Sequence, residues 1–191
     1  MDFIDALESL PVLETPRLIL RRVRPTDAEA IFSYASRPEV TAHLTWRTHR
    51  NLEDTYLFIQ GLQYGYAEGT AADWGMILRE DGRLIGTIGM AHTSRLHHFG
   101  EVGYVLHPDY WGRGLVAEAL RAVIGFAFTH GLNRVEAVHA VENTASGRVM
   151  EKAGMTYEGV LRKRYCLQGQ HRDVKMYSIL REEWERTEAE Q

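Results

Sequence analysis

Cysteine, long apolar runs and an excess of positive charge are all scarce or missing in this sequence of 191 residues. Its single cysteine, Cys166, excludes an internal disulfide framework and a cysteine-based zinc cluster, and favours a reducing compartment. No apolar run approaches the roughly 20 residues that cross a bilayer. The N-terminus is acidic where a secretion signal would be basic. We therefore expect a cytoplasmic protein with no membrane partner.

Acidic and basic residues nearly balance. The sequence holds 22 Lys and Arg against 26 Asp and Glu, which gives a net charge of −4. This mild acidity argues against nucleic acid as a partner. The length and the 45% share of hydrophobic residues suit one domain over 1–191 with a core of about 14–182. We expect an irregular lead-in at 1–16 and an acidic, frayed tail at 185–191.

The first half of the chain is expected to form two helices and four strands, with the strands at 17–24, 73–79, 83–92 and 100–107. One helix begins at Pro25-Thr26-Asp27 and the other spans 52–67. The last three strands are joined by short turns, one of them Glu80-Asp81-Gly82. Short connections of this kind imply an antiparallel meander.

The second half changes in character. The pattern predicts an amphipathic helix over 112–131, a strand over 134–140 and a short helix over 143–153. Two last strands, at 156–167 and 172–180, are joined through 168–170. Since the strand–helix–strand stretch 100–140 requires a parallel crossover, the sheet is mixed. We expect an α+β fold with three layers, α/β/α, and a largely antiparallel sheet.

Two glycines stand between a predicted strand and the long helix. Gly112 and Gly114 let the backbone approach a ligand closely. The helix behind them presents free N–H groups and a positive dipole end, and Arg113 adds a charge. This combination indicates a phosphate or pyrophosphate site. Taken alone, the loop is also compatible with a turn that binds nothing.

Nucleotide-binding alternatives fit less well. The P-loop signature is absent, which argues against an NTPase. Residues 112–117 match the dinucleotide fingerprint G-x-G-x-x-A, but they follow an antiparallel meander rather than the first strand of a parallel sheet. Glu136 lies at the distance of the ribose-binding acid, yet near the start of the next strand. An NAD site is therefore disfavoured.

A second motif covers 143–155. Asn143 is a good helix N-cap, Ser146 lies near the helix start, and Arg148 and Lys152 are one turn apart. Capping and solvation explain these residues without a ligand.

Together and in this order, the two motifs resemble the GNAT superfamily of acyl-CoA-dependent N-acetyltransferases, and most closely its ribosomal-protein N-terminal acetyltransferase group. The resemblance covers about 14–182. It is carried by Glu14-Thr15-Pro16-Arg17-Leu18, Thr45-Trp46, Glu101-Val102-Gly103-Tyr104-Val105-Leu106, Tyr110-Trp111-Gly112-Arg113-Gly114, Asn143-Thr144-Ala145-Ser146, Lys152-Ala153-Gly154-Met155 and Glu158-Gly159. It implies a splay between the strand ending near Leu106 and the strand starting near Arg134.

The resemblance also implies acetyl-CoA as co-substrate and no metal. Its pyrophosphate would bind backbone N–H groups of Trp111, Gly112, Arg113, Gly114, Leu115 and Val116. The pantetheine arm would lie in the splay beside Leu106 and bond Asn143, with Arg148 and Lys152 near the outer phosphates. One departure stands out. The ribosomal group often places a proposed catalytic carboxylate where this chain has Tyr165.

The implied reaction is direct attack of a primary amine on the acetyl thioester in a ternary complex. It needs a neutral amine, an oxyanion donor and an acid for the thiolate. An α-amine with a pKa of about 7.7–8.0 is about 10–20% neutral at pH 7, whereas a lysine is about 0.04% neutral. Glu101 is the candidate base, directly or through water, and Ser146 the candidate acid. A backbone N–H near Val105 or Leu106 is the expected oxyanion donor.

Several residues keep two interpretations. Trp46, Tyr104 and Tyr165 either line the acceptor pocket or simply pack. Cys166 has no evident His partner, which argues against a covalent acyl-enzyme. The histidines gathered around one turn lack a carboxylate set, which argues against a metal site. They are His92, His97, His98 and His107.

The acceptor stays open. A ribosomal protein N-terminus, another peptide, a polyamine, an amino acid or an antibiotic amine all satisfy the chemistry. The basic residues Arg162, Lys163, Arg164, Arg172 and Lys175 either attract an acidic acceptor or form a solvated face. A non-catalytic acyl-CoA-binding module is the main alternative function, and a homodimer is left open.

Overall fold

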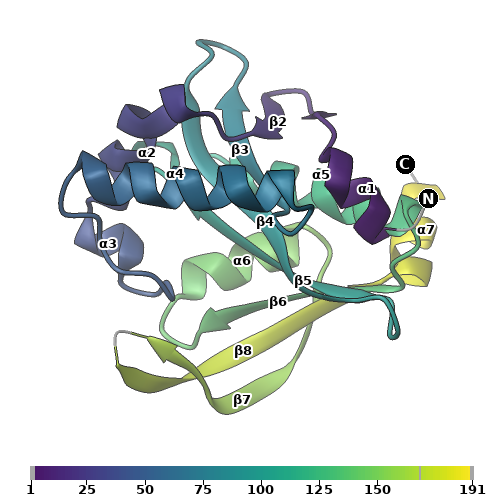
Figure 1. Ribbon diagram of the computed structural model, residues 1–191. Coiled ribbons are helices and arrows are strands. Elements are labelled where there is room, and N and C mark those ends of the chain that lie inside the picture. Colours follow the sequence, from purple (N-terminus) through teal and green to yellow (C-terminus); the bar gives the residue numbers. More distant parts are fainter. Residues whose placement is uncertain (1–2, 168, 190–191) are drawn as a thin grey trace.

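The computed structural model describes residues 3–167 and 169–189 and shows a sheet covered by helices on both faces (Figure 1). Within these residues eight strands pair in the order β1-β2-β3-β4-β5-β6-β8-β7, and all neighbours are antiparallel except β5 and β6. The strands are β1 Leu13–Glu14, β2 Leu18–Arg22, β3 Asp73–Leu78, β4 Leu84–Ser94, β5 Phe99–Leu106, β6 Arg134–Ala140, β7 Thr156–Leu167 and β8 Gln170–Leu180.

The helices are α1 Phe3–Ser9, α2 Ala28–Ala35, α3 Pro38–Thr41, α4 Leu52–Ala67, α5 Leu115–Thr129, α6 Thr144–Lys152 and α7 Arg181–Ala189. Helices α2 and α4 cover one face of the sheet, and α5 and α6 cover the other. The expected three-layer α+β fold with a largely antiparallel sheet is confirmed. Gln168, in the predicted connection between the last two strands, lies outside the described residues.

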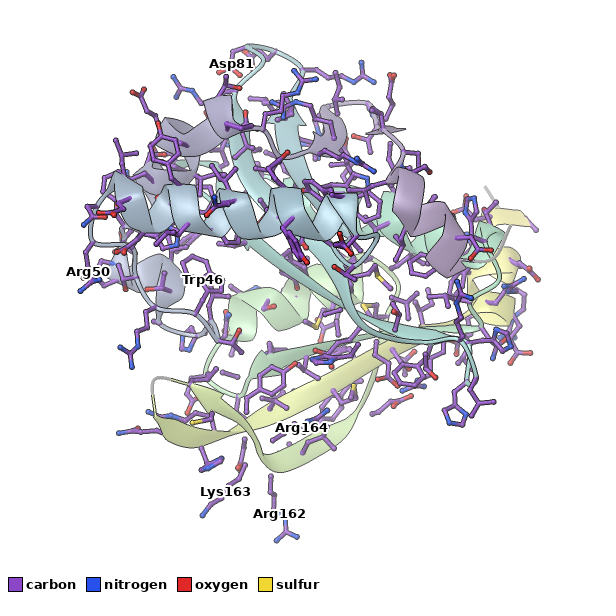
Figure 2. All side chains as sticks on the ribbon, viewed as in Figure 1. Trp46, Arg50, Asp81, Arg162, Lys163 and Arg164 are labelled. Atoms are coloured by element: carbon purple, nitrogen blue, oxygen red, sulfur yellow. The ribbon has the colours of Figure 1, made fainter. Side chains whose placement is uncertain are left out.

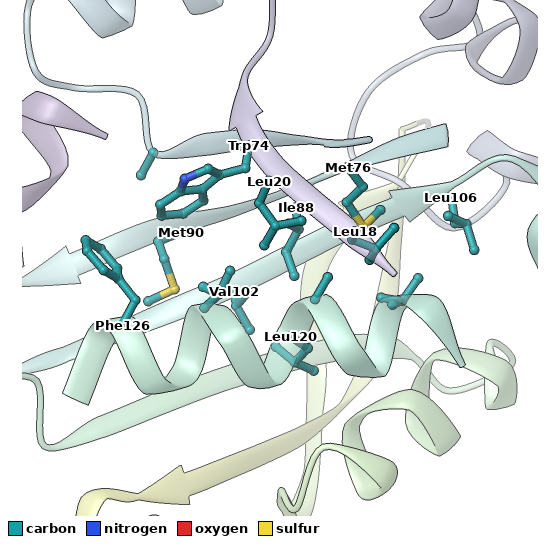
Figure 3. Packing of buried hydrophobic residues seen from close by; sticks show 14 of the residues in the cluster. Leu18, Leu20, Trp74, Met76, Ile88, Met90, Val102, Leu106, Leu120 and Phe126 are labelled. Carbon is teal, nitrogen blue, oxygen red and sulfur yellow. The ribbon is translucent and has the colours of Figure 1, made fainter. Parts of the chain in front are cut away.

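Alternate residues of the central strands build the core against α5. Leu18 and Leu20, Trp74 and Met76, and Ile88 and Met90 are buried at two-residue spacing, as one face of a strand requires (Figure 3). Helix α5 meets them with Leu120, Val123 and other buried residues at helical spacing. Because side chains alternate along a strand, the other face of β3, β4 and β5 points toward α2 and α4.

The sheet splits between β5 and β6. Their parallel ladder consists of three pairs, Phe99–Arg134, Gly100–Val135 and Glu101–Glu136. Beyond Glu101 the two strands diverge, while β6 stays paired with β8 along its whole length. The splay expected near Leu106 is therefore confirmed, and it leaves one edge of β5 without a strand partner.

Both ends of the chain are more ordered than expected. The predicted irregular lead-in is wrong over Phe3–Ser9, where a helix buries Phe3, Ala6 and Leu7. Apolar residues at helical spacing decide this, because the prolines that suggested irregularity, Pro11 and Pro16, follow the helix. The predicted frayed tail is likewise helical as far as Ala189.

Candidate active site

The glycine loop is open and has its amides available. Strand β5 ends at Leu106, a 3₁₀ turn spans Pro108–Tyr110, and Gly112 and Gly114 both adopt φ of 75° before α5 begins. A Cβ at Gly112 would have no protein atom within 4 Å. Gly114 is the N-cap of α5 and has no side chain to cap the first N–H groups. The loop therefore presents free amides and a helix dipole to an anion.

A network behind the loop holds it in place. The Nε–H of Arg17 donates to Oε2 of Glu118 at 2.6 Å, and its Nη1 donates to the carbonyl of Arg113 at 2.9 Å. Thr15 Oγ1 donates to Glu118 Oε1 at 2.6 Å. Burial alone would raise the pKa of Glu118, but these hydrogen bonds outweigh it and lower the pKa. Sequence reasoning missed Glu118, whose position on the first turn of α5 was the available signal.

Two residues of the loop differ in detail from expectation. The Trp111 N–H donates to the carbonyl of Pro108 at 3.0 Å, so the amides available to an anion begin at Gly112. The Trp111 indole N–H donates to the carbonyl of Leu106 at 2.8 Å. The Arg113 guanidinium lies 5.0 Å from the ring centroid of Tyr110, folded back along the loop.

The free edge of β5 offers backbone donors to the gap. The His107 N–H donates to the carbonyl of Ile85 on β4 at 2.8 Å. Bonded pairs alternate along an antiparallel ladder, so Val105 bonds β4 while the N–H groups of Tyr104 and Leu106 face the splay. Of the two predicted oxyanion donors, Leu106 has the suitable orientation.

Two hydroxyl groups meet across the splay. The Tyr104 hydroxyl on β5 lies 2.8 Å from Ser146 Oγ on α6 and donates to the Ser146 carbonyl at 3.0 Å. Asn143 Oδ1 caps α6 by accepting from the Ser146 N–H at 3.3 Å. Burial raises the pKa of Tyr104, so its hydroxyl keeps its proton. Arg148 and Lys152 are exposed on the same helix.

Glu101 and Tyr165 also meet, although they are far apart in sequence. The Tyr165 hydroxyl on β7 donates a short hydrogen bond to Oε1 of Glu101 on β5. Burial, this hydrogen bond and the Glu101 charge raise the pKa of Tyr165. The register of β7 against β8 shifts between Leu161 and Tyr165, where Lys163 adopts φ of 50°.

The basic residues at this shift lie on the outer side of the hairpin. Figure 2 shows Arg162 and Lys163 projecting away from the rest of the molecule. The Arg164 guanidinium lies 5.9 Å from the ring centroid of Tyr165. The single cysteine, Cys166, is exposed on β7.

A pocket of about 270 Å³ lies on the face of the sheet toward α2 and α4, beside the free edge of β5. It is lined by Ile31, Tyr34, Ala35, Leu44, Thr45, Trp46, His49, Phe58, Asp73, Thr87, Gly89, Met90, Ala91, Gly103, Tyr104 and Val105. Of the predicted acceptor-side residues, Trp46 and Tyr104 line it, whereas Tyr165 is placed with Glu101. Trp46 comes from the loop between α3 and α4 (Figure 2).

Sequence reasoning missed two titratable residues of this pocket. Burial raises the pKa of Asp73 to about 6. Burial lowers the pKa of His49, whose Nδ1 lies 2.9 Å from Thr55 Oγ1. The signal for Asp73 was a lone acid at the start of an otherwise apolar strand, Asp73–Leu78. We found no signal for His49.

Neither a metal-binding cluster nor a membrane-spanning helix occurs within 3–167 and 169–189. No group of three or more His, Cys, Asp or Glu side chains is arranged to hold a metal ion there. None of the helices in these ranges has the length and apolar character needed to span a bilayer.

Known proteins match most of the chain. The acetyltransferase (GNAT) domain family matches residues 17–156. The uncharacterized N-acetyltransferase YoaA of Bacillus subtilis is 37% identical over 172 residues, which cover 90% of this chain and 97% of that protein. The ribosomal-protein-serine acetyltransferase of Escherichia coli is 32% identical over 127 residues, covering 66% of this chain and 70% of that protein.

A solved structure of an acetyltransferase has a similar fold. The GNAT-family acetyltransferase of Bacillus anthracis superposes with a TM-score of 0.80 at 30% identity, covering 90% of this chain and 99% of that one. The glycine loop, the splay and the hydroxyl pair therefore lie in a fold that is shared with known acetyltransferases. The chain belongs to the GNAT family of N-acetyltransferases, which use acetyl-CoA as the acetyl donor.

Proposed function

We propose that this enzyme acetylates a primary amine by direct transfer in a ternary complex in the cytoplasm, with the N-terminal amine of a protein as the favoured acceptor. The observation that carries the proposal is the free edge of β5. It lies between the open glycine loop and a pocket of about 270 Å³. A donor entering from the loop and an acceptor entering from the pocket would meet at this edge.

The residues around the gap fit acetyl-CoA. The amides from Gly112 to Val116 are suited to its pyrophosphate, and Asn143 at the start of α6 to its pantetheine arm. Arg148 and Lys152 are exposed on α6 and suited to outer phosphates. The bound coenzyme supplies the acetyl group as a thioester.

Each proton has a proposed acceptor or donor. Glu101, held by the Tyr165 hydroxyl, takes a proton from the amine as the new C–N bond forms, directly or through water. The Leu106 N–H stabilises the oxyanion. As the C–S bond breaks, Ser146, held by the Tyr104 hydroxyl at 2.8 Å, gives a proton to the sulfur and takes one back from water, while Glu101 releases its proton to water.

An N-terminal acceptor is favoured by chemistry. An α-amine is about 10–20% neutral at pH 7, so a single carboxylate such as Glu101 suffices where a lysine would need more help. The E. coli relative named as a ribosomal-protein-serine acetyltransferase is consistent with this choice. Tyr165 stands where the ribosomal group often has a carboxylate, and its bond to Glu101 suggests that the β5 carboxylate acts instead.

The first test measures coenzyme binding and thiol release. Acetyl-CoA at about 100 times its dissociation constant is expected to add about 2.7 kcal/mol to the free energy of unfolding. NAD serves as the control and is expected to add nothing. Thiol release is then measured with peptides that begin with alanine or serine, their N-acetylated forms, spermidine and lysine amide.

The outcomes separate the alternatives. Stabilisation with thiol release only from free N-terminal amines supports the proposal, and preference for spermidine or lysine amide would replace the acceptor. Stabilisation without thiol release from any amine would indicate a binding module. A shift with NAD and none with acetyl-CoA would contradict the proposed coenzyme site.

A further inference from the structure

Three residues form one row across the central strands on the pocket face. Asp73 of β3 is the register partner of Gly89 on β4, and Gly89 is the partner of Gly103 on β5. Register partners project on the same face of a sheet. The row therefore begins with a carboxylate and continues over two positions that have no side chain, ending at the free edge of β5.

The Asp73 carboxylate leans along this row. A Cβ at Gly89 would lie 2.4 Å from Asp73 Oδ1 and 2.8 Å from its Cγ, so the carboxylate occupies the space that a side chain at Gly89 would fill. A Cβ at Gly103 would have no atom within 4 Å. A trough thus runs from the Asp73 carboxylate to open space above Gly103, two residues along β5 from Glu101.

The pocket supplies Asp73 with no counter-charge. Among the described residues, none donates a hydrogen bond to the Asp73 carboxylate or forms an ion pair with it. The titratable groups that face it are His49 before α4, Tyr34 on α2 and Tyr66 on α4. Burial lowers the pKa of His49 and raises that of Tyr34 and Tyr66, so all three are neutral near pH 7.

The remaining walls are suited to an organic cation. Trp46, Phe58 and Tyr34 provide aromatic faces and edges, and Leu44 and Ile31 provide apolar surface. Aromatic faces attract ammonium groups, and a partly buried carboxylate is stabilised by a cation that it can bond. An uncompensated carboxylate in such a pocket therefore indicates a cationic ligand with an apolar or aromatic part.

We propose that Asp73 determines acceptor specificity by binding the ammonium group of the incoming amine in the trough over Gly89 and Gly103. This inference rests on the proposed function, because it assigns the acceptor side of the same site. Asp73 selects protonated primary amines over uncharged molecules of the same shape. The amine is held beside Glu101. The bound ammonium first loses one proton to bulk water, which gives the neutral amine that attacks, and Glu101 takes the second proton as the C–N bond forms.

The test uses small probes and the protein saturated with coenzyme A. Backbone amide signals are followed by NMR near neutral pH during titration with 2-phenylethylamine or with 2-phenylethanol, its uncharged analogue. We expect the amine to shift the signals of Gly89 and Gly103 and to bind about tenfold or more tightly than the alcohol. Equal binding of the two probes, or no shift with the amine, would overturn the proposal.

Three variants sharpen the test. Asp73→Asn is expected to abolish the preference for the amine, and Gly103→Val to weaken amine binding by filling the trough while keeping the carboxylate. Glu80→Gln, the same chemical change at an exposed position in the turn after β3, is the matched control and should bind as the wild type. Retention of the preference in Asp73→Asn contradicts the proposal.

Kinetics with any accepted amine separate the two acidic residues. Asp73→Asn is expected to raise KM for the amine with a small change in kcat, whereas Glu101→Gln is expected to lower kcat. An unchanged KM in Asp73→Asn, with acetyl-CoA still stabilising the protein, defeats this inference alone. Loss of the acetyl-CoA effect in the wild type defeats the proposed function instead.

Discussion

Burial of Asp73 destabilises the folded protein at pH values where its carboxyl is charged. Its folded-state pKa of about 6 lies above the ordinary value of 3.8, so the folded chain binds this proton more tightly than the unfolded chain does. Stability is therefore lost as pH rises from below the ordinary pKa through the folded-state value, and the loss is complete above it. The physical cause is burial of the charge in a pocket that has no cation.

Replacing Asp73 with Asn should therefore stabilise the protein near pH 8. The expected gain in unfolding free energy is on the order of 2–3 kcal/mol, and it should shrink to well under about 1 kcal/mol at pH 4, where the folded-state carboxyl is protonated and the unfolded-state carboxyl is about half protonated. Urea denaturation of both proteins at the two pH values measures it, with Glu80→Gln as control. A gain that is equal at both pH values would contradict the assigned cause.

At the scale of elements, two glycines with similar backbones and equally open surroundings lie on either side of α5. Gly112 precedes the helix with φ of 75°, and Gly131 follows it with φ of 100°. A Cβ at either position would have no protein atom within 4 Å. A difference between alanine variants at the two positions therefore reports on a ligand rather than on a clash within the chain.

Gly112→Ala and Gly131→Ala should each lower the free energy of unfolding by about 1 kcal/mol, because both place an L-residue at positive φ. Only Gly112→Ala is expected to weaken acetyl-CoA binding, since its methyl group occupies the approach to the loop amides. Calorimetric titration with acetyl-CoA measures this. Equal affinities in the two variants would place the pyrophosphate elsewhere.

The hairpin of β7 and β8 brings Tyr165 to Glu101, although the two residues are far apart in the sequence. Its register shift accompanies the placement of Tyr165 against Glu101, while Arg162 and Lys163 face outward. The pattern of 156–167 predicts a strand, but it does not reveal which strand across the sheet a tyrosine will reach. That depends on the curvature of the hairpin, which is a property of the assembled sheet.

At the scale of the whole molecule, helices α1 and α7 pack against α5 (Figure 1). The Phe3 ring of α1 lies 5.7 Å from that of Phe126, and the Trp184 ring of α7 lies 6.3 Å from that of Phe128. Both contacts are near the end of α5 that is remote from the glycine loop. The terminal helices therefore support the helix whose opposite end carries the proposed coenzyme site.

Phe3→Ala is expected to lower the free energy of unfolding by about 3–4 kcal/mol, because Phe3 is only 2% exposed. Acetyl-CoA affinity should be unchanged, since the loop lies at the other end of α5. Val12→Ala, at a residue that is 57% exposed, is the control. A loss as small as that of the control would show that α1 does not dock in solution.

The sequence by itself determined the elements that local rules specify. Alternation and helical spacing predicted the main strands and helices, and Gly112 and Gly114 between a strand and a helix predicted the anion loop. These features depend on residues close together in the chain, where backbone sterics and periodic burial act. The same local rules gave a wrong prediction at Phe3–Ser9. Nearby prolines indicated irregular structure there, but the segment forms a helix that is stabilised by packing on Phe126.

Only the tertiary structure decided which distant side chains meet. Asp73, Gly89 and Gly103 share a row because of strand register, and Tyr165 reaches Glu101 because of a shifted hairpin. Hydrophobic patterning selects which face of a strand is buried, but many strand orders and curvatures satisfy the same pattern. The proposed acceptor pocket depends on those long-range arrangements, so it could be identified only from the assembled sheet.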